Sequence, residues 1–273
     1  MNKIPEKAYK NLKFLNSPAA RPIRILCEYE ETRQRFAQQR IHHTLVFFGS
    51  ARTRSSDDAK ALLHSAQHAL AAHPESPEVQ AQVSMAEKAV KMSRYYDEAR
   101  QLAERITEWS MGRESGRQFV ITSGGGPGIM EAANRGANDV EGGRSIGLGI
   151  SLPFEQGVNE YVTDELAFEF HYFFTRKYWF LYLCKALVIF PGGFGTMDEL
   201  FETLTLVQTG KVRKDLPIVL YGSDYWNKVI NIPAMAEFGT ISAADIDLIH
   251  VSDSVEDAFQ HLKARLEGND PTG

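Results

Sequence analysis

Cysteine is scarce in this chain, and long apolar runs are absent. The 273 residues include two cysteines, Cys27 and Cys184, which lie far apart and form no C-x-x-C pair. A disulfide framework is therefore not expected, and a reduced setting is the default. No apolar stretch approaches the roughly 18 residues of a membrane-spanning helix. Charges from Lys3 onward leave no apolar signal-peptide core, so we expect a cytoplasmic protein with no membrane partner.

The chain also lacks an excess of basic residues. It has 30 Lys and Arg against 35 Asp and Glu, a net charge of -5, whereas nucleic-acid binding demands a basic face. We therefore expect no nucleic-acid partner. The hydrophobic fraction of 43% is ordinary for a globular protein with a sizeable core, and the length allows one large α/β domain or two small ones.

Several cofactor motifs are missing as well. There is no G-x-x-x-x-G-K-[ST] sequence, which argues against a P-loop ATPase. The residues 49–54 do not match the G-x-G-x-x-G of a nicotinamide oxidoreductase, and Pro127 removes a phosphate-binding N–H from the turn at 124–128. No His and Cys cluster has metal-ligand spacing, and no pyridoxal phosphate lysine motif is recognisable. We predict neither a cofactor nor a metal ion.

What the chain does have is a regular alternation of strands and helices. The predicted strands are 44–48, 119–122, 145–150, 166–170, 186–190, 216–221 and 248–251. The predicted helices between and after them are 129–138, 173–183, one opening at Thr196, 224–238 and 255–266. This order predicts an α/β fold, a doubly wound, Rossmann-like parallel sheet with additional N-terminal helices.

The expected organisation has two parts. Residues 1–43 are predicted to be an N-terminal helical extension that packs outside the core or makes an oligomer contact. Residues 44–268 are predicted to be a nucleotide-binding catalytic domain with a helical insertion at about 55–116. Within the insertion, Ser55 is expected to begin one helix, and Ser76 with Pro77 to begin a longer one.

Three glycine-containing turns follow three different predicted strands. They are Gly49-Ser50, Gly124-Gly125-Gly126 and Gly192-Gly193-Phe194-Gly195-Thr196. Glycines at strand ends often only turn the chain. Three such turns at the same edge of one parallel sheet would instead line a groove with backbone, and the helix N-terminus after the last turn would attract a phosphate. The pattern therefore favours a nucleotide site.

The segment Pro191–Glu199 resembles the PGGxGTxxE signature of the Lonely Guy (LOG) family, the cytokinin riboside 5'-monophosphate phosphoribohydrolases. Arg176-Lys177 corresponds to the family's upstream RK pair, and residues 124–131 resemble its GGGxxGxM element. With Gly49-Ser50 and residues 152–156, the resemblance covers roughly 44–251. The additional N-terminal residues and the insertion look more like the longer bacterial type. Family members were often labelled lysine decarboxylases, a label that the residues here do not support.

The resemblance implies hydrolysis of a nucleoside 5'-monophosphate, AMP or N6-modified AMP, to a free base and ribose 5-phosphate. It implies that Glu199 and Arg176 are catalytic, and that the protein is a homodimer or a higher homo-oligomer. A carboxylate near C1' suits this chemistry, because the transition state carries positive charge on the ribose. The predicted substrate-binding residues are Gly49, Ser50, Gly124, Gly125, Gly126, Glu131, Lys177, Gly192, Gly193, Gly195 and Thr196.

Each candidate also has a structural interpretation. Thr196 and Glu199 are spaced as a T-x-x-E capping box, in which the glutamate only bonds a backbone N–H. Asp198 is expected to interact favourably with the positive end of the helix dipole, and Arg176 could be a surface cation. Glu131 could merely favour its helix N-terminus, Ser50 could terminate its strand, and Lys177 is expected to point away from Arg176. The alternative function is a nucleotide- or cofactor-binding carrier or sensor that does not hydrolyse its ligand.

Overall fold

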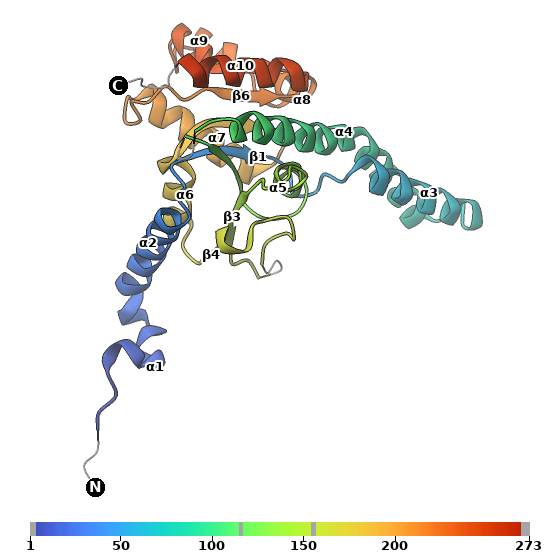
Figure 1. Ribbon diagram of the computed structural model, residues 1–273. Helices are drawn as coiled ribbons and strands as arrows, with labels where there is room; N and C mark the ends of the chain where they lie inside the picture. The colour runs from blue at the N-terminus through green and yellow to red at the C-terminus, as the bar shows by residue number, and fades with distance from the viewer. Residues whose placement is uncertain (1–3, 115–116, 154–156, 269–273) are drawn as a thin grey trace.

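The computed structural model describes residues 4–114, 117–153 and 157–268 (Figure 1). At its centre lies a seven-stranded parallel sheet with the order β4-β3-β2-β1-β5-β6-β7. The strands are β1 (His43–Phe48), β2 (Phe119–Ser123), β3 (Ser145–Ile150), β4 (Ala167–Phe170), β5 (Cys184–Ile189), β6 (Ile218–Tyr221) and β7 (Ile249–Ser252). All seven predicted strands are present, and the predicted doubly wound α/β fold is confirmed.

The chain winds in two directions from the middle of the sheet. Strands β1 to β4 are laid down outward in sequence, and β5 then returns to the free side of β1. The C-terminal ends of β1 and β5 are neighbours, since Phe48 pairs with Ile189. In doubly wound sheets, ligands bind outside the carboxyl ends of the strands at the point where the winding reverses. In this sheet that point lies between β1 and β5.

Helices cover the sheet and extend beyond it. The α-helices are α1 (Leu12–Leu15), α2 (Arg21–Gln38), α3 (Ser56–Ala72), α4 (Pro77–Met111), α5 (Ile129–Asn138), α6 (Phe173–Tyr182), α7 (Phe194–Gln208), α8 (Ser223–Val229), α9 (Ile232–Glu237) and α10 (Val255–Gly268). Short 3₁₀ segments occur at Ala8–Lys10, Pro18–Ala20, Asp164–Leu166 and Ala243–Leu248. No helix of the described residues is long and apolar enough to cross a bilayer.

The core has two layers, one on each face of the sheet. Successive strand residues point to opposite faces, so Leu45 and Phe47 pack with α4, α5 and α10. Val46 and Phe48 pack with α2, α6, α7 and α8 on the other face. Burial on both faces explains why these strands read as continuous apolar runs.

Two sets of helices project from opposite sides of the sheet in Figure 1. The N-terminal helices run out from α2, which is anchored by contacts of Phe36 and Tyr29 with Trp179 of α6. Helix α3 lies against the far end of α4. The predicted starts of both insertion helices are confirmed, because the Ser55 and Ser76 hydroxyls accept bonds from the backbone three residues on. The division into an extension and a catalytic domain stays a prediction.

Two helix predictions were wrong. Helix α7 begins at Phe194, with Gly193 as its N-cap, and not at Thr196. The single helix predicted over 224–238 is two helices, α8 and α9. Pro233 in the first turn of α9 explains the break, because a proline cannot follow four helical residues without displacing the carbonyl of the preceding turn.

Candidate functional site

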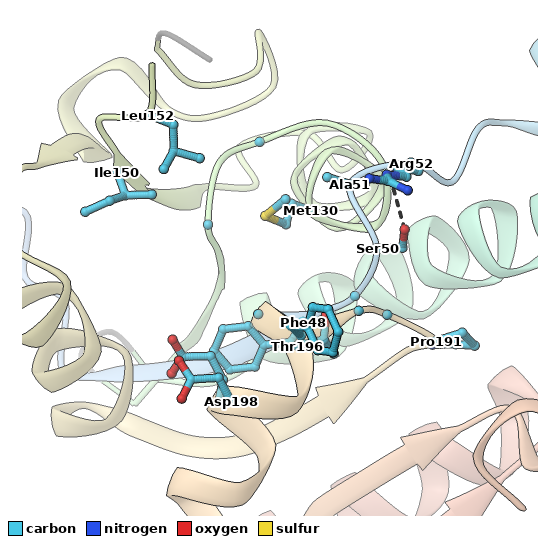
Figure 2. A pocket seen from close by; sticks show the side chains of 18 of the residues that line it. Phe48, Ser50, Ala51, Arg52, Met130, Ile150, Leu152, Pro191, Thr196 and Asp198 are labelled. Atoms are coloured by element: carbon cyan, nitrogen blue, oxygen red, sulfur yellow. Dashed lines mark hydrogen bonds between the residues drawn. The ribbon is translucent and has the colours of Figure 1, made fainter. Parts of the chain in front are cut away.

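A cavity of about 700 Å³ opens at the carboxyl edge of the sheet, over the reversal between β1 and β5 (Figure 2). Its walls come from the turns that follow β1, β2 and β5, from the end of β3, and from α6 and α7. Its volume lies in the range of small-molecule sites, about 300–1,000 Å³. The glycine turns that are far apart in the sequence thus meet in one place.

Backbone hydrogen bonds join these turns directly. The Ser50 N–H donates to the Pro191 carbonyl at 3.0 Å, which ties the turn after β1 to the turn after β5. The Ile129 N–H donates to the Ser50 carbonyl at 3.1 Å, which ties the same turn to α5. The Tyr225 hydroxyl donates to the Gly192 carbonyl at 2.6 Å. The frame of the cavity is therefore held largely by main-chain atoms.

The N-terminus of α7 faces the cavity. Gly193 caps the helix without a side-chain hydrogen bond, and the first-turn residues Phe194, Gly195 and Thr196 line the cavity. A Cβ added to Gly193 or Gly195 would meet no atom within 4 Å. An uncapped helix N-terminus presents backbone N–H groups and a partial positive charge, so this end of α7 suits an anion.

Glu199 lies in the second turn of α7 and is 6% exposed. Because the helix begins at Phe194, Glu199 is not the glutamate of a capping box. Its carboxylate lies 3.3 Å from the Lys177 ammonium instead. Burial raises the pKa of Glu199, whereas the charges of Lys177 and Arg176 act to lower it, and the net direction is upward. The site therefore holds a buried carboxylate whose proton affinity is increased.

Arg176 of α6 is half-buried and close enough to this carboxylate for the two charges to interact. Its Nε donates to the Leu148 carbonyl at 2.7 Å, and its guanidinium lies 4.9 Å from the centre of the Phe180 ring. Burial lowers the pKa of Arg176, and the charge of Glu199 opposes that effect. A Cβ on Gly124 would approach the guanidinium to 2.7 Å, so this glycine makes room for the arginine. Arg176 is thus a half-buried cation held by the Leu148 carbonyl, not a freely exposed one.

Lys177 forms ion pairs with three carboxylates of α7. Its ammonium lies 2.9 Å from Asp198, 3.3 Å from Glu199 and 2.5 Å from Glu202. Burial acts to lower the pKa of Lys177, but its bonds to Glu202 and Asp198 outweigh burial and raise it. Asp198 is therefore a partner of Lys177 as well as a neighbour of the helix N-terminus. The lysine stays charged and ties α6 to α7 behind the cavity.

The predicted site residues divide into two groups. Those that line the cavity are Gly49, Ser50, Gly124, Gly126, Arg176, Gly192, Gly193, Gly195, Thr196 and Glu199. Gly125, Glu131 and Lys177 are not among the described residues that line it. The Glu131 carboxylate accepts a hydrogen bond from the Tyr96 hydroxyl at 2.5 Å and faces α4. Residues 154–156 of the family resemblance lie outside the described residues.

Some lining residues were missed by sequence reasoning. Met92 comes from α4, whose apolar positions look like ordinary core or interface positions. Tyr225 comes from α8, and Arg52 follows the Gly49-Ser50 turn. No sequence pattern marks Met92 or Tyr225, because each reaches the cavity through tertiary packing. Arg52 was visible beside a predicted turn but carried no motif.

Other chemistries find less support in the described part of the chain. No group of three or more His, Cys, Asp or Glu residues could hold a metal ion there. No lysine is among the described residues that line the cavity, so the residues present do not fit a pyridoxal phosphate group bound through a lysine.

A comparison with protein families finds a match over the second half of the chain. Residues 130–262 match a family model described as "Possible lysine decarboxylase". The match runs from the start of α5 into α10 and includes Arg176, Lys177 and the whole Pro191–Glu199 segment. No curated protein matches the chain. The matched segment is the LOG-family domain, formerly called lysine decarboxylase-like, and the chain therefore carries a LOG-family domain over residues 130–262.

Proposed function

We propose that this protein hydrolyses the N-glycosidic bond of a nucleoside 5'-monophosphate, AMP or N6-modified AMP, to free base and ribose 5-phosphate. One observation carries the proposal. A buried carboxylate, Glu199, lies on the wall of the cavity one turn beyond an uncapped helix N-terminus that suits a phosphate. The LOG-family domain supports a role of this kind.

The geometry of α7 relates the two ends of such a substrate. Gly195 and Glu199 are four residues apart, about 6 Å along the helix axis. Helical side chains tilt toward the N-terminus, which brings the carboxylate back toward the phosphate position. A nucleotide whose phosphate sits on the first turn of α7 would hold its ribose against Glu199. The phosphate then orients the ribose and contributes binding energy remote from the reacting bond.

The proposed step needs no group beyond this chain and water. The bond between C1' and the base nitrogen breaks, and its electron pair leaves with the base. Positive charge grows on C1', where the Glu199 carboxylate stabilises it. Water forms the new bond to C1' and gives a proton to Glu199, which acts as the general base. The departing base nitrogen takes up a proton and Glu199 releases the one that it accepted from water, so the protons balance over the cycle.

Arg176 and Lys177 have different parts in this proposal. Arg176 lines the cavity, so its guanidinium can contact the substrate as charge moves in the transition state. Lys177 lies behind Glu199 and is a positioning residue, because it holds the carboxylate and favours its ionised form. Both cations therefore support a carboxylate that burial alone would tend to protonate.

We also propose that the protein works as a homodimer or a higher homo-oligomer. Several aromatic rings on α6 and at the start of α7 are exposed, and Phe194 reaches 93% exposure. Phe194 lines the cavity and also a second groove along α7 with Met197 and Phe201. A second copy seated on this groove would lie at the rim of the cavity. The two cysteines are unpaired, which fits a cytoplasmic setting.

The test is incubation of the purified protein with a panel of nucleoside 5'-monophosphates, including N6-prenylated AMP, followed by chromatography. Release of base and ribose 5-phosphate by the wild type, and not by Glu199→Gln, is the expected result. It would also rank the bases. Binding of nucleotide without release of any base would contradict hydrolysis and favour a carrier or sensor.

A further inference from the structure

Arg52 is a cation at the rim of the cavity to which neither the sequence nor the family match assigns a role. It follows β1 at the reversal point of the sheet and lines the cavity. Its side chain is exposed, and none of the described residues gives its guanidinium a hydrogen-bond or ion-pair partner. An arginine that lines a cavity with all its donors unused is positioned to bind a ligand.

The other two cations of the site interact with carboxylates of α7. Among the described residues that line the cavity, the cations are Arg52 and Arg176. The half-buried Arg176 guanidinium is bonded to the Leu148 carbonyl, lies over the Phe180 ring and interacts with the charge of Glu199. Lys177, behind the wall, is shared among three carboxylates. Arg52 is therefore the cation of the cavity lining that has no carboxylate partner among the described residues and can pair with a doubly charged phosphate.

The cavity is polarised from one end to the other. Figure 2 shows Ser50 and Arg52 on one side and the Asp198 carboxylate on the opposite side, with Thr196 between them. Asp198 lies beside Glu199 on α7, and the cations Arg176 and Lys177 interact with these carboxylates. An anionic group is attracted to Arg52 and the first turn of α7, where no carboxylate of the described residues is paired with the cation. A polarised cavity of this kind fixes the direction in which a charged substrate lies.

The turn that carries Arg52 is held in place before any ligand arrives. The Arg52 N–H donates to the Ser50 hydroxyl at 3.1 Å. The Ser50 N–H in turn donates to Pro191, at the start of the turn that leads into α7. Arg52 and the N-terminus of α7 are therefore parts of one hydrogen-bonded frame, so the backbone needs little ordering when a phosphate binds.

We propose that Arg52 binds the 5'-phosphate of the substrate and lets the site choose a phosphorylated nucleoside over the nucleoside itself. This inference rests on the proposed function, because it places a phosphomonoester dianion between Arg52 and the first turn of α7. The guanidinium offers two parallel N–H donors to the phosphate oxygens. The anomeric carbon then lies toward Glu199.

The test measures binding and not turnover. In a Glu199→Gln background, the dissociation constants for AMP and adenosine are measured by calorimetry with and without Arg52→Ala. We expect Arg52→Ala to weaken AMP binding about 10- to 100-fold, the loss of a charge-assisted hydrogen bond, and to leave adenosine binding unchanged. Arg52→Lys should restore part of the affinity. Arg54→Ala is the matched control, since Arg54 is exposed on the same segment but is not among the lining residues.

The pH dependence separates a phosphate contact from a structural role. A phosphomonoester loses its second charge near pH 6, so AMP binding that uses Arg52 should weaken as the pH falls from 7.5 to about 5. The weakening should be smaller in Arg52→Ala. Equal losses for AMP and adenosine, or wild-type AMP affinity in Arg52→Ala, would overturn the proposal. Because binding is the readout, an absence of hydrolysis by the wild type would count against the proposed function and leave the Arg52 measurement interpretable.

Discussion

Two glycine turns at the same edge of the sheet are built for different purposes. Gly128, before α5, has a φ of +73°, and a Cβ there would lie 2.3 Å from the Ser50 carbonyl oxygen. Gly193 and Gly195, at the start of α7, are surrounded by open space. Packing explains the first glycine, whereas nothing in the described chain explains the other two. They leave room for something that is not part of the protein fold.

The helix N-termini beside these turns differ in the same way. The first N–H of α5 donates to Ser50, so that end of the helix is used internally. The first turn of α7 lines the cavity and has no side-chain cap. Similar glycine-rich sequences therefore serve packing in one turn and leave an open helix N-terminus in the other. The predictions below test this contrast.

The largest effect is expected at the carboxylate beside the open turn. Glu199→Gln should lower base release by about 10²–10⁴-fold, because the amide cannot take a proton from water. Nucleotide binding should persist, since the turn and Arg52 are unchanged. Chromatography of base and ribose 5-phosphate measures the first quantity and calorimetry the second. Hydrolysis within a few-fold of the wild-type rate would remove Glu199 from the mechanism.

The contrast between the turns is tested by one alanine in each. Gly195→Ala should weaken nucleotide binding about tenfold or more, because a methyl group enters the phosphate position, while unfolding free energy rises by about 0.5–1 kcal/mol from improved helix propensity. Gly128→Ala should lower unfolding free energy by about 2–4 kcal/mol, through its positive φ and the contact with Ser50.

Denaturant unfolding and nucleotide titration of the two variants decide the matter. Gly195→Ala is expected to keep its stability and lose nucleotide affinity. Gly128→Ala is expected to lose mainly stability. If Gly195→Ala lost stability and kept its affinity, the open space at the start of α7 would have no binding role.

A smaller effect is expected behind the cavity wall. Lys177→Met removes a charge that lowers the pKa of Glu199, so that pKa should rise further. The proposed mechanism needs the ionised carboxylate, so the acid limb of the pH–activity profile should move up by about one pH unit. At pH values on the acid limb, the variant should have about tenfold less activity than the wild type, and the difference should disappear at higher pH. A pH profile measures it, with Lys211→Met, an exposed lysine, as control. An unshifted limb would show that Lys177 does not tune Glu199.

The smallest effect concerns stability. Burial raises the pKa of Glu199, so the folded state favours the protonated carboxyl, and that contribution to stability is lost as the pH rises through the folded pKa. Glu199→Gln should therefore raise unfolding free energy by about 0.5–2 kcal/mol at pH 8, and by less at pH 4. Thermal unfolding at both pH values tests this sign. A variant less stable than the wild type at pH 8 would contradict it.

Local patterns predicted the strands and the edge where the site lies. Short apolar runs located each strand to within two residues of its bounds, and glycine or proline marked the ends of some of them. The start of α7 was wrong because Thr196 and Glu199 have capping-box spacing, and the sequence does not say that the Gly193 turn leads directly into the helix. A local pattern with two possible helix starts is resolved only by how the turn packs on its neighbours.

Roles that depend on contacts between distant elements were the hardest to predict. Glu131 was predicted to bind substrate, but its carboxylate accepts a hydrogen bond from Tyr96, which lies 35 residues away on α4. Lys177 was expected to point away from Arg176, and no sequence pattern shows that three carboxylates of α7 face it. No sequence pattern predicted that Met92 of α4 lines the cavity either. Such contacts follow from helix packing and leave no spacing signal.

The hydrogen bonds that join the turns bear on how such a site can change its substrate. The bonds among Ser50, Pro191 and Ile129 use main-chain atoms alone. Any residue type supplies these atoms, except that proline has no N–H to donate. Rim side chains such as Met92 and Leu152 take no part in that frame. If the protein acts as proposed, substitutions there would alter the base that fits while Glu199 and the turns stay in place. Specificity and chemistry would then depend on different residues. Such a scaffold is a favourable starting point for divergence and for redesign.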